Sequence, residues 1–179
     1  MADDAFMYFG PSCEIKVKGE TTDKTFDGKD AFELKSVSFG IENASSVGSA
    51  TGGDGQGKTS FNPISITKQV DSASASLVKA CTLGKHQKEA FIELRRAGGG
   101  SGSSSGGTFM KFSFKEVLVT KVEWTGSGGE ENVEETVEFV YGAVKVEYWM
   151  QGTDGKLKKP PSGAEAEWSV VKNEAQLKV

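Results

Sequence analysis

The sequence has little of what most enzymes and metalloproteins need. It contains one histidine, two cysteines and four prolines among 179 residues. A single histidine and two distant cysteines do not supply the three or four ligands of a usual zinc site. Nothing in the sequence fixes a nucleophile or a carboxylate beside His86 either, so the common catalytic constellations are excluded. We expect no enzyme, no cofactor and no metal, and we expect His86 to have a helix-terminal or turn role.

Long apolar runs and an excess of positive charge are also missing. No window approaches 18 apolar residues, which argues against a transmembrane helix, and the acidic start (MADD) does not resemble a signal peptide. With 21 basic and 25 acidic residues the net charge is −4, and no basic stripe indicates nucleic-acid binding. We expect a protein made in the cytoplasm without membrane insertion. Cys13 and Cys81 are expected to be reduced and buried, with a disulfide as the open alternative.

Alternation of apolar and polar residues with period two is abundant and is typical of β-strands. In the first such segment, Cys13, Ile15 and Val17 alternate with charged residues. The expected strands span residues 13–18, 32–42, 58–67, 89–96, 108–114, 117–124, 133–141, 144–150 and 166–171. Strands this frequent predict a mainly β fold, a two-sheet barrel or sandwich, in a single domain over residues 1–179.

One segment departs from this pattern. From Ala73 to Cys81 the apolar residues recur at three- and four-residue spacing, which places them on one face of a helix. Asp71 or Ser72 can accept hydrogen bonds from the free N–H groups of a first turn. Gly84 stands where a left-handed C-terminal cap belongs. The pattern predicts one short α-helix over about residues 72–83.

Long loops are expected over residues 19–31, 43–57 and 97–107. The third is a Gly/Ser run with the composition of a flexible linker, but the strands on either side are too few for two cores, so it is interpreted as a hairpin loop. Within the second, Gly52 to Thr59 matches the phosphate-binding pattern G-x-x-x-x-G-K-[ST]. That chemistry needs a helix after the lysine, whereas the following residues alternate as a strand and include Pro63. We interpret the match as a glycine-rich loop.

The acidic run and the tryptophans each have an ordinary and a functional interpretation. Residues 130–135 lack the alternating Asp/Asn and the glycine of a calcium loop, so they are expected to form a solvated turn before a strand. Trp124, Trp149 and Trp168 are expected to be core or interface anchors. A sugar-binding platform of tryptophans would instead suit a monomeric carbohydrate- or protein-binding β-domain.

The expected strand at residues 32–42 has two contrasting faces. Val, Phe and Ile at alternate positions suit a core, whereas Ser36, Ser38 and Gly40 form a small, polar and uncharged row. Such a row suits a channel wall along which cargo slides. It suits an ordinary solvent-facing strand equally well.

Six motifs follow one another in a specific order. The first is a strand ending in Thr67-Lys68, an Asp-Ser-capped helix and Gly84-Lys85-His86; the others lie at residues 91–98, 115–122, 126–130 and 135–148, and at Trp168 with Lys172-Asn173. Together they resemble the Hcp family of type VI secretion proteins over about residues 32–173. The loop at 98–107 looks longer than the usual hairpin of the family, and the first 31 residues fit only loosely.

The resemblance implies a β-barrel that assembles into hexameric rings, which stack into a tube inside a contractile sheath. Its implied partners are further copies, the sheath, spike and baseplate proteins, and effectors carried in the channel or at the tip. The tube would be secreted when the sheath contracts. A tail-tube protein of another phage-like contractile system stays an alternative.

The resemblance also assigns roles to particular residues. In the family, the strand corresponding to residues 32–42 lines the channel, so Ser36 and Ser38 are expected to face the lumen and contact effectors. A loop protrudes at the next point of the chain in the family. It predicts ring-stacking contacts at Ser46, Val47, Gly52, Gly53, Gly55 and Gly57.

Overall fold

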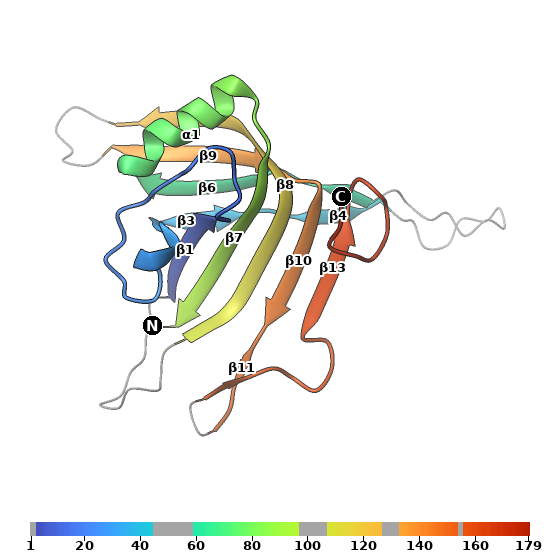
Figure 1. Ribbon diagram of the computed structural model, residues 1–179. Coiled ribbons are helices and arrows are strands. Elements are labelled where there is room, and N and C mark those ends of the chain that lie inside the picture. The colour runs from blue at the N-terminus through green and yellow to red at the C-terminus, as the bar shows by residue number, and fades with distance from the viewer. Residues whose placement is uncertain (1–2, 45–58, 97–106, 127–132, 154–155) are drawn as a thin grey trace.

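The computed structural model describes residues 3–44, 59–96, 107–126, 133–153 and 156–179 (Figure 1). Its elements in chain order are β1 (Asp3–Phe9), the 3-10 helix η1 (Asp27–Lys29), β2 (Phe32–Leu34), β3 (Ser36–Ser38), β4 (Ile41–Asn43), β5 (Thr59–Phe61), β6 (Ile64–Gln69), α1 (Ser72–Leu83), β7 (Gln87–Arg96), β8 (Gly107–Thr125), β9 (Glu134–Val140), β10 (Ala143–Tyr148), β11 (Met150–Gln151), β12 (Leu157–Lys158) and β13 (Glu165–Ser169). The predicted mainly β fold with one helix is confirmed.

The strands form two sheets that share strand β8. Its first part pairs with β7 and β10, and its second part pairs with β9. The first sheet therefore runs β2-β1-β7-β8-β10-β13, and the second runs β8-β9-β6-β3. At the other corner, β2 pairs with β1 and the next residues, β3, pair with β6. The chain therefore passes from one sheet to the other twice, once within β8 and once between β2 and β3, and these two crossings close a barrel.

The corner in β8 differs from the expectation of two separate strands. Residues 107–125 form one strand, and Glu116, at the point where β8 changes sheets, has a left-handed backbone (φ 49°). This single residue departs from extended geometry, so the strand bends without ending. Conversely, the expected strand 58–67 divides at Pro63, which has no N–H to donate to a ladder.

The main core lies between the sheets and contains one side of α1. Ala73, Leu77 and Ala80 of the helix are fully buried against it. The side chain of Asp71 accepts a hydrogen bond from the backbone N–H of Ala73, and Gly84 ends the helix with φ 59°. The predicted helix and both of its caps are confirmed.

The N-terminal region departs most from expectation. Cys13, Ile15 and Val17 are buried as the alternation suggested, but residues 13–18 form no strand because no neighbouring strand pairs with their backbone. Strand β1 was not predicted. Its sequence, DDAFMYF, does not alternate, because Met7 faces the main core while Phe6 and Tyr8 belong to a second cluster with Phe26.

The loops and the cysteines agree only in part with what the sequence predicts. The expected loop at 19–31 contains η1, whereas most of the loops at 43–57 and 97–107 lies outside the described residues. Cys13 is buried and Cys81 is only half-buried, and both thiols are free. No helix in the described part of the chain is long and apolar enough to cross a membrane. The described residues also contain no group of three or more His, Cys, Asp or Glu side chains placed to hold a metal ion.

The second cluster is organised around Glu93 of β7. Glu93 accepts hydrogen bonds from Tyr8 Oη at 2.6 Å and from Thr108 Oγ1 at 2.7 Å, and Lys29 Nζ lies 3.2 Å from its Oε1. Phe26 stacks on Phe6 with ring centroids 4.2 Å apart. These contacts attach the irregular segment that contains η1 to the outer face of the first sheet.

Glu93 gives the fold a predictable dependence on pH. Burial raises its pKa, but hydrogen bonds from Tyr8 and Thr108, with the charges of Lys29 and Lys111, bring the pKa below the ordinary 4.5. A lowered folded-state pKa contributes stability above the unfolded-state pKa, and this contribution is lost as pH falls through the folded value. We expect the free energy of unfolding, from urea titrations on either side of pH 4.5, to fall more steeply with acid in the wild type than in Glu93→Gln. Equal slopes would contradict this role.

Candidate functional site

One face of the second sheet is polar across all four of its strands. Its cross-strand rows are Ser36–Thr67–Thr136–Glu123 and Ser38–Ser65–Glu138–Lys121, followed by Gln69–Glu134–Thr125. Directly paired residues project to the same side of a sheet, so these side chains share one face. Ser36 and Ser38 therefore lie at one side of a continuous wall that has no apolar side chain in these rows.

The opposite face of the same sheet belongs to the core. Val37, Ile66, Val137 and Val122 form the row between the two polar rows, and all of them pack in or against the main cluster. Helix α1 also packs on this core side. A shift of one residue in register would exchange the two faces, so the buried valine and isoleucine row fixes the polar side outward.

A β-bulge brings the charged residues of β8 onto the polar face. Strict alternation from the buried Val119 would direct Lys121 into the core. The register between β8 and β9 shifts between these two residues, and the extra residue, Thr120, donates a side-chain hydrogen bond to the carbonyl of Glu138 at 3.2 Å. The bulge reverses the alternation, so Lys121 and Glu123 project outward.

The charges on this wall are mostly paired. Lys121 Nζ lies 2.8 Å from Glu123 Oε2 and 3.6 Å from Glu138 Oε1, and its hydrogen bond with Glu123 raises its pKa. Lys35 Nζ lies 2.7 Å from Glu134 Oε1. Exposed pairs like these contribute little to stability. Glu123, Glu134 and Glu138 lie against two lysines, so the β8–β9 half of the wall keeps a small net negative charge, beside a β3–β6 half that carries hydroxyl groups.

A buried ionic network supports the wall from behind. Lys68 and Glu135 are paired across β6 and β9, and their side chains are 1% and 0% exposed. Lys68 Nζ lies 3.0 Å from Glu135 Oε2, 2.7 Å from Asp71 Oδ1 and 3.2 Å from Ser74 Oγ. Ser74 Oγ in turn donates to Glu135 at 2.5 Å. The network joins two strands of the wall to the first turn of α1.

This network was not expected from the sequence. The acidic run at residues 130–135 is expected to be a solvated turn, whereas Glu135 is a fully buried strand residue. The spacing of the apolar residues did carry a signal for it. Lys68 follows Ile64 and Ile66 at the two-residue spacing of the core-facing side of a strand. Glu135 precedes Val137 and Phe139 at the same spacing. Opposite charges on two core faces indicate a buried pair.

The remaining candidate residues do not join this face. His86 lies between the end of α1 and the start of β7, which fits the expected helix-terminal role, with Nδ1 3.7 Å from Glu116 Oε2 on the surface. Trp124 is half exposed at the end of β8, and Trp168 lines an apolar pocket of about 250 Å³ with Ile41 and Phe61.

The glycine-rich loop lies largely beyond what the structure describes. Thr59, the last residue of the phosphate-loop pattern, begins strand β5 and not a helix, which agrees with rejecting a nucleotide site. The proposed stacking residues Ser46, Val47, Gly52, Gly53, Gly55 and Gly57 lie outside the described residues, and their role stays a prediction.

The chain is similar in sequence to known type VI secretion proteins. A family model described as "Type VI secretion system effector, Hcp" matches residues 6–148. The curated Protein hcp1 of Pseudomonas aeruginosa is 36% identical over 98 residues, which cover 55% of this chain and 58% of that protein. The match therefore spans less than two thirds of the length of that relative.

Two solved structures are similar over nearly the whole chain. "Structure of a type six secretion system protein" superposes with a TM-score of 0.82 at 26% identity, covering 98% of this chain and 100% of that one. Hcp1 from Salmonella typhimurium superposes with a TM-score of 0.71, also at 26% identity and with the same coverage.

Proposed function

Because this chain belongs to the Hcp family of type VI secretion system effectors, we propose that it is the structural subunit of a secretion tube. Copies close head to tail into hexameric rings, and the rings stack into a tube that a contracting sheath propels. Family membership disfavours both a tail-tube protein of another contractile system and a monomeric carbohydrate-binding domain.

The polar face of the second sheet is the observation that carries this proposal. A channel that lets cargo pass needs a hydrated surface without apolar patches or strong unpaired charge, because either would hold the cargo. The rows that begin at Ser36 and Ser38 have this character over four strands. We assign this face to the lumen and the residues along it to transient contacts with effectors.

Assembly and partners follow from the same proposal. A head-to-tail contact that closes gives a ring, and a stacking contact that does not close gives a filament. The proposed partners are further copies, the sheath, spike and baseplate proteins, and effectors. The chain is made in the cytoplasm and is exported when the apparatus fires.

Ring formation is tested by measuring the mass of the purified protein. Size-exclusion chromatography with light scattering should give about six times 19.0 kDa, and negative-stain images of that peak should show rings. A clean monomer over the whole accessible concentration range would contradict the proposed function.

Arginine at the proposed lumen should disturb cargo more than assembly. In Ser36→Arg/Ser38→Arg, each copy adds two long cationic side chains to an exposed hydroxyl row. We expect rings of unchanged mass but a change of at least about tenfold in effector secreted per tube protein, because charge complementarity sets such contacts. Quantitative mass spectrometry of culture supernatants measures this ratio.

The matched control is Ser162→Arg, at an exposed serine in a bend outside the second sheet. It should leave the effector ratio unchanged. An unaltered ratio in Ser36→Arg/Ser38→Arg would instead remove these serines from the lumen.

A further inference from the structure

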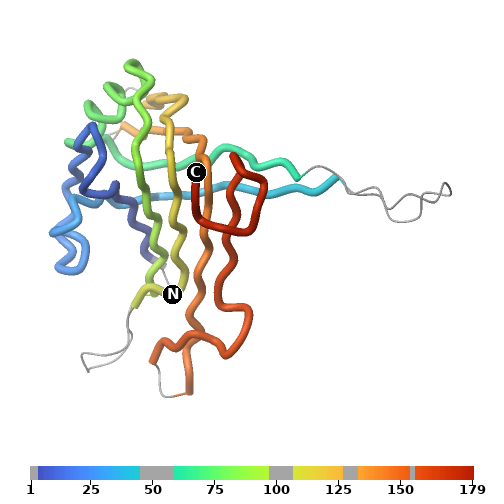
Figure 2. Tube along the Cα trace, turned by 45° about the vertical axis from the view of Figure 1, so that its right-hand side comes forward, coloured from blue at the N-terminus to red at the C-terminus, as the bar shows by residue number. Residues whose placement is uncertain are grey.

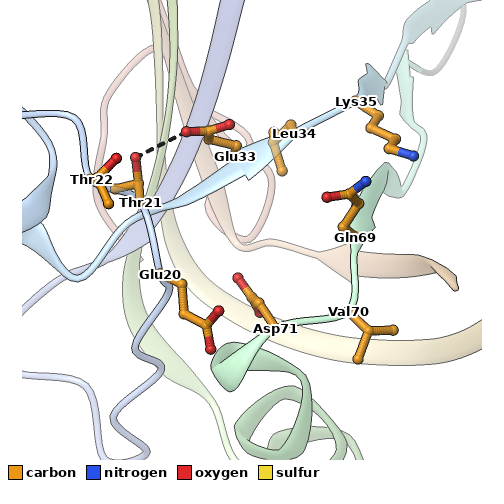
Figure 3. A pocket seen from close by; sticks show the side chains of 9 residues that line it. All are labelled: Glu20, Thr21, Thr22, Glu33, Leu34, Lys35, Gln69, Val70 and Asp71. Carbon is orange, nitrogen blue, oxygen red and sulfur yellow. Dashed lines mark hydrogen bonds between the residues drawn. The ribbon is translucent and has the colours of Figure 1, made fainter. Parts of the chain in front are cut away.

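A pocket of about 420 Å³ lies where β2, the end of β6 and the start of α1 meet (Figure 3). We call it the acidic notch and define it by Glu20, Glu33, Val70 and Asp71, which line it. Val70 is an apolar side chain that remains 47% exposed. The notch therefore combines an exposed apolar wall with three carboxylates.

Two of these carboxylates, Glu20 and Glu33, form no ion pair within the part of the chain that the structure describes. The third carboxylate, Asp71, forms an ion pair with the buried Lys68. Lys35, which also lines the notch, forms an ion pair with Glu134. Glu20 Oε1 accepts only the backbone N–H of Ser72 at 2.9 Å, and Glu33 Oε1 accepts the hydroxyl of Thr21 at 3.2 Å. Among the described residues, no lysine or arginine forms an ion pair with Glu20 or Glu33.

A turn after β13 has the complementary chemistry. Val171 is 68% exposed, the highest value for a large apolar side chain in the described residues. The neighbouring Lys172 is exposed and forms no ion pair within them. The turn is held in place by hydrogen bonds from Lys172 N to Ser169 Oγ at 3.1 Å and from Val171 N to the Gly142 carbonyl at 3.2 Å. An apolar side chain and a cation are thus both exposed at neighbouring positions of a fixed backbone.

The turn and the notch lie on opposite sides of the molecule. In Figures 1 and 2 the blue segment and the start of α1, which supply residues of the notch, lie on one side of β7, β8 and β10, and the red segment after β13 lies on the other. One copy cannot bring the two together. Two complementary surfaces on opposite sides form a heterologous contact between copies, and such a contact can close into a ring.

We propose that the turn Val171–Lys172 of one copy docks in the acidic notch of the next. The ammonium group of Lys172 lies between Glu20 and Glu33, and Val171 covers Val70. This inference rests on the ring proposed above and identifies the two surfaces that close it. It requires nothing of the polar face, which stays free for cargo.

Reversal of charge on each side tests the contact. Glu33→Lys and Lys172→Glu each place like charges against one another, so each should weaken ring assembly at least about tenfold. The double variant Glu33→Lys/Lys172→Glu restores opposite charges and should recover rings of wild-type mass. Light scattering over a dilution series measures the mass of the two single variants and of the double variant. Circular dichroism verifies that each variant retains its strand content. Glu33→Gln and Lys172→Gln replace any variant that loses it.

The matched control is Lys79→Glu, which makes the same charge change at an exposed lysine of α1 that belongs to neither the notch nor the turn. It should leave the ring intact. Single reversals that keep the ring, or a double variant that does not recover it, would overturn the docking contact while leaving the proposed function standing. A wild-type chain that never exceeds a monomer would overturn both.

Discussion

Replacing Lys68 with methionine should lower the free energy of unfolding by about 3–5 kcal/mol. The ammonium group of Lys68 is the only cation within hydrogen-bonding distance of Glu135 among the described residues, and neither side chain reaches solvent. Without it, the Glu135 carboxylate stays buried and uncompensated, and the first turn of α1 loses its attachment to β6. Urea denaturation at one fixed protein concentration measures the loss, because assembly makes apparent stability depend on concentration.

Two further variants separate burial from charge. Lys68→Met/Glu135→Leu removes both charges and should recover most of the loss, because replacing a whole buried pair by apolar groups is close to neutral. Lys35→Met breaks the exposed pair with Glu134 and should cost less than about 1 kcal/mol. A cost for Lys68→Met no greater than that of Lys35→Met would show that the network does not anchor the helix.

Phe114→Ala should be about as destabilising, by roughly 3–5 kcal/mol. Phe114 is fully buried in β8, with ring centroids 5.1 Å from Tyr141 and 6.0 Å from Phe39. It lies two residues before the bend at which β8 passes between the sheets, so the cavity would open where both sheets depend on one strand. Thermal and urea unfolding, at the same protein concentration, measure the effect.

Phe109→Ala on the same strand is the matched control. Phe109 is only half-buried, under the guanidinium group of Arg96 at 4.7 Å, so the same truncation should cost about 1 kcal/mol. Similar losses for the two variants would contradict the central position of Phe114 in the core.

The face that we propose for cargo and the surfaces that we propose for contacts between copies differ in chemistry. The polar face of the second sheet is hydrated and nearly without apolar groups, whereas the proposed docking surfaces pair an exposed valine with charge, and the buried network around Lys68 lies beneath both the wall and the notch. Asp71 belongs to that network and also lines the notch. Its pairing with Lys68 leaves Glu20 and Glu33 as the carboxylates available to a neighbouring copy.

Several features were predictable from the sequence because they depend on residues close together in the chain. The spacing of apolar residues and the caps at Asp71 and Gly84 predict the helix, because capping and helix periodicity act within a few residues. Alternation likewise predicts that Ser36 and Ser38 share a face. The ordered motifs sufficed to identify the family.

Other features depended on partners that lie far away in the chain. Residues 13–18 alternate like a strand but find no partner, whereas β1 does not alternate because packing covers both of its faces. The bulge at Thr120, which reverses the outward side of β8, exists only in the register with β9. A ladder is formed by two strands, so the residues of one strand do not determine it.

The sequence by itself determined the class of fold, the helix and its ends, and the polar character of the strand around Ser36 and Ser38, because local periodicity and capping specify these. Only the tertiary structure decided that this polarity continues across four strands, that Lys68 and Glu135 meet in the core, and that the notch and the Val171–Lys172 turn lie on opposite sides. Each of these depends on strand order and register, which long-range packing selects from many arrangements that the same local pattern allows.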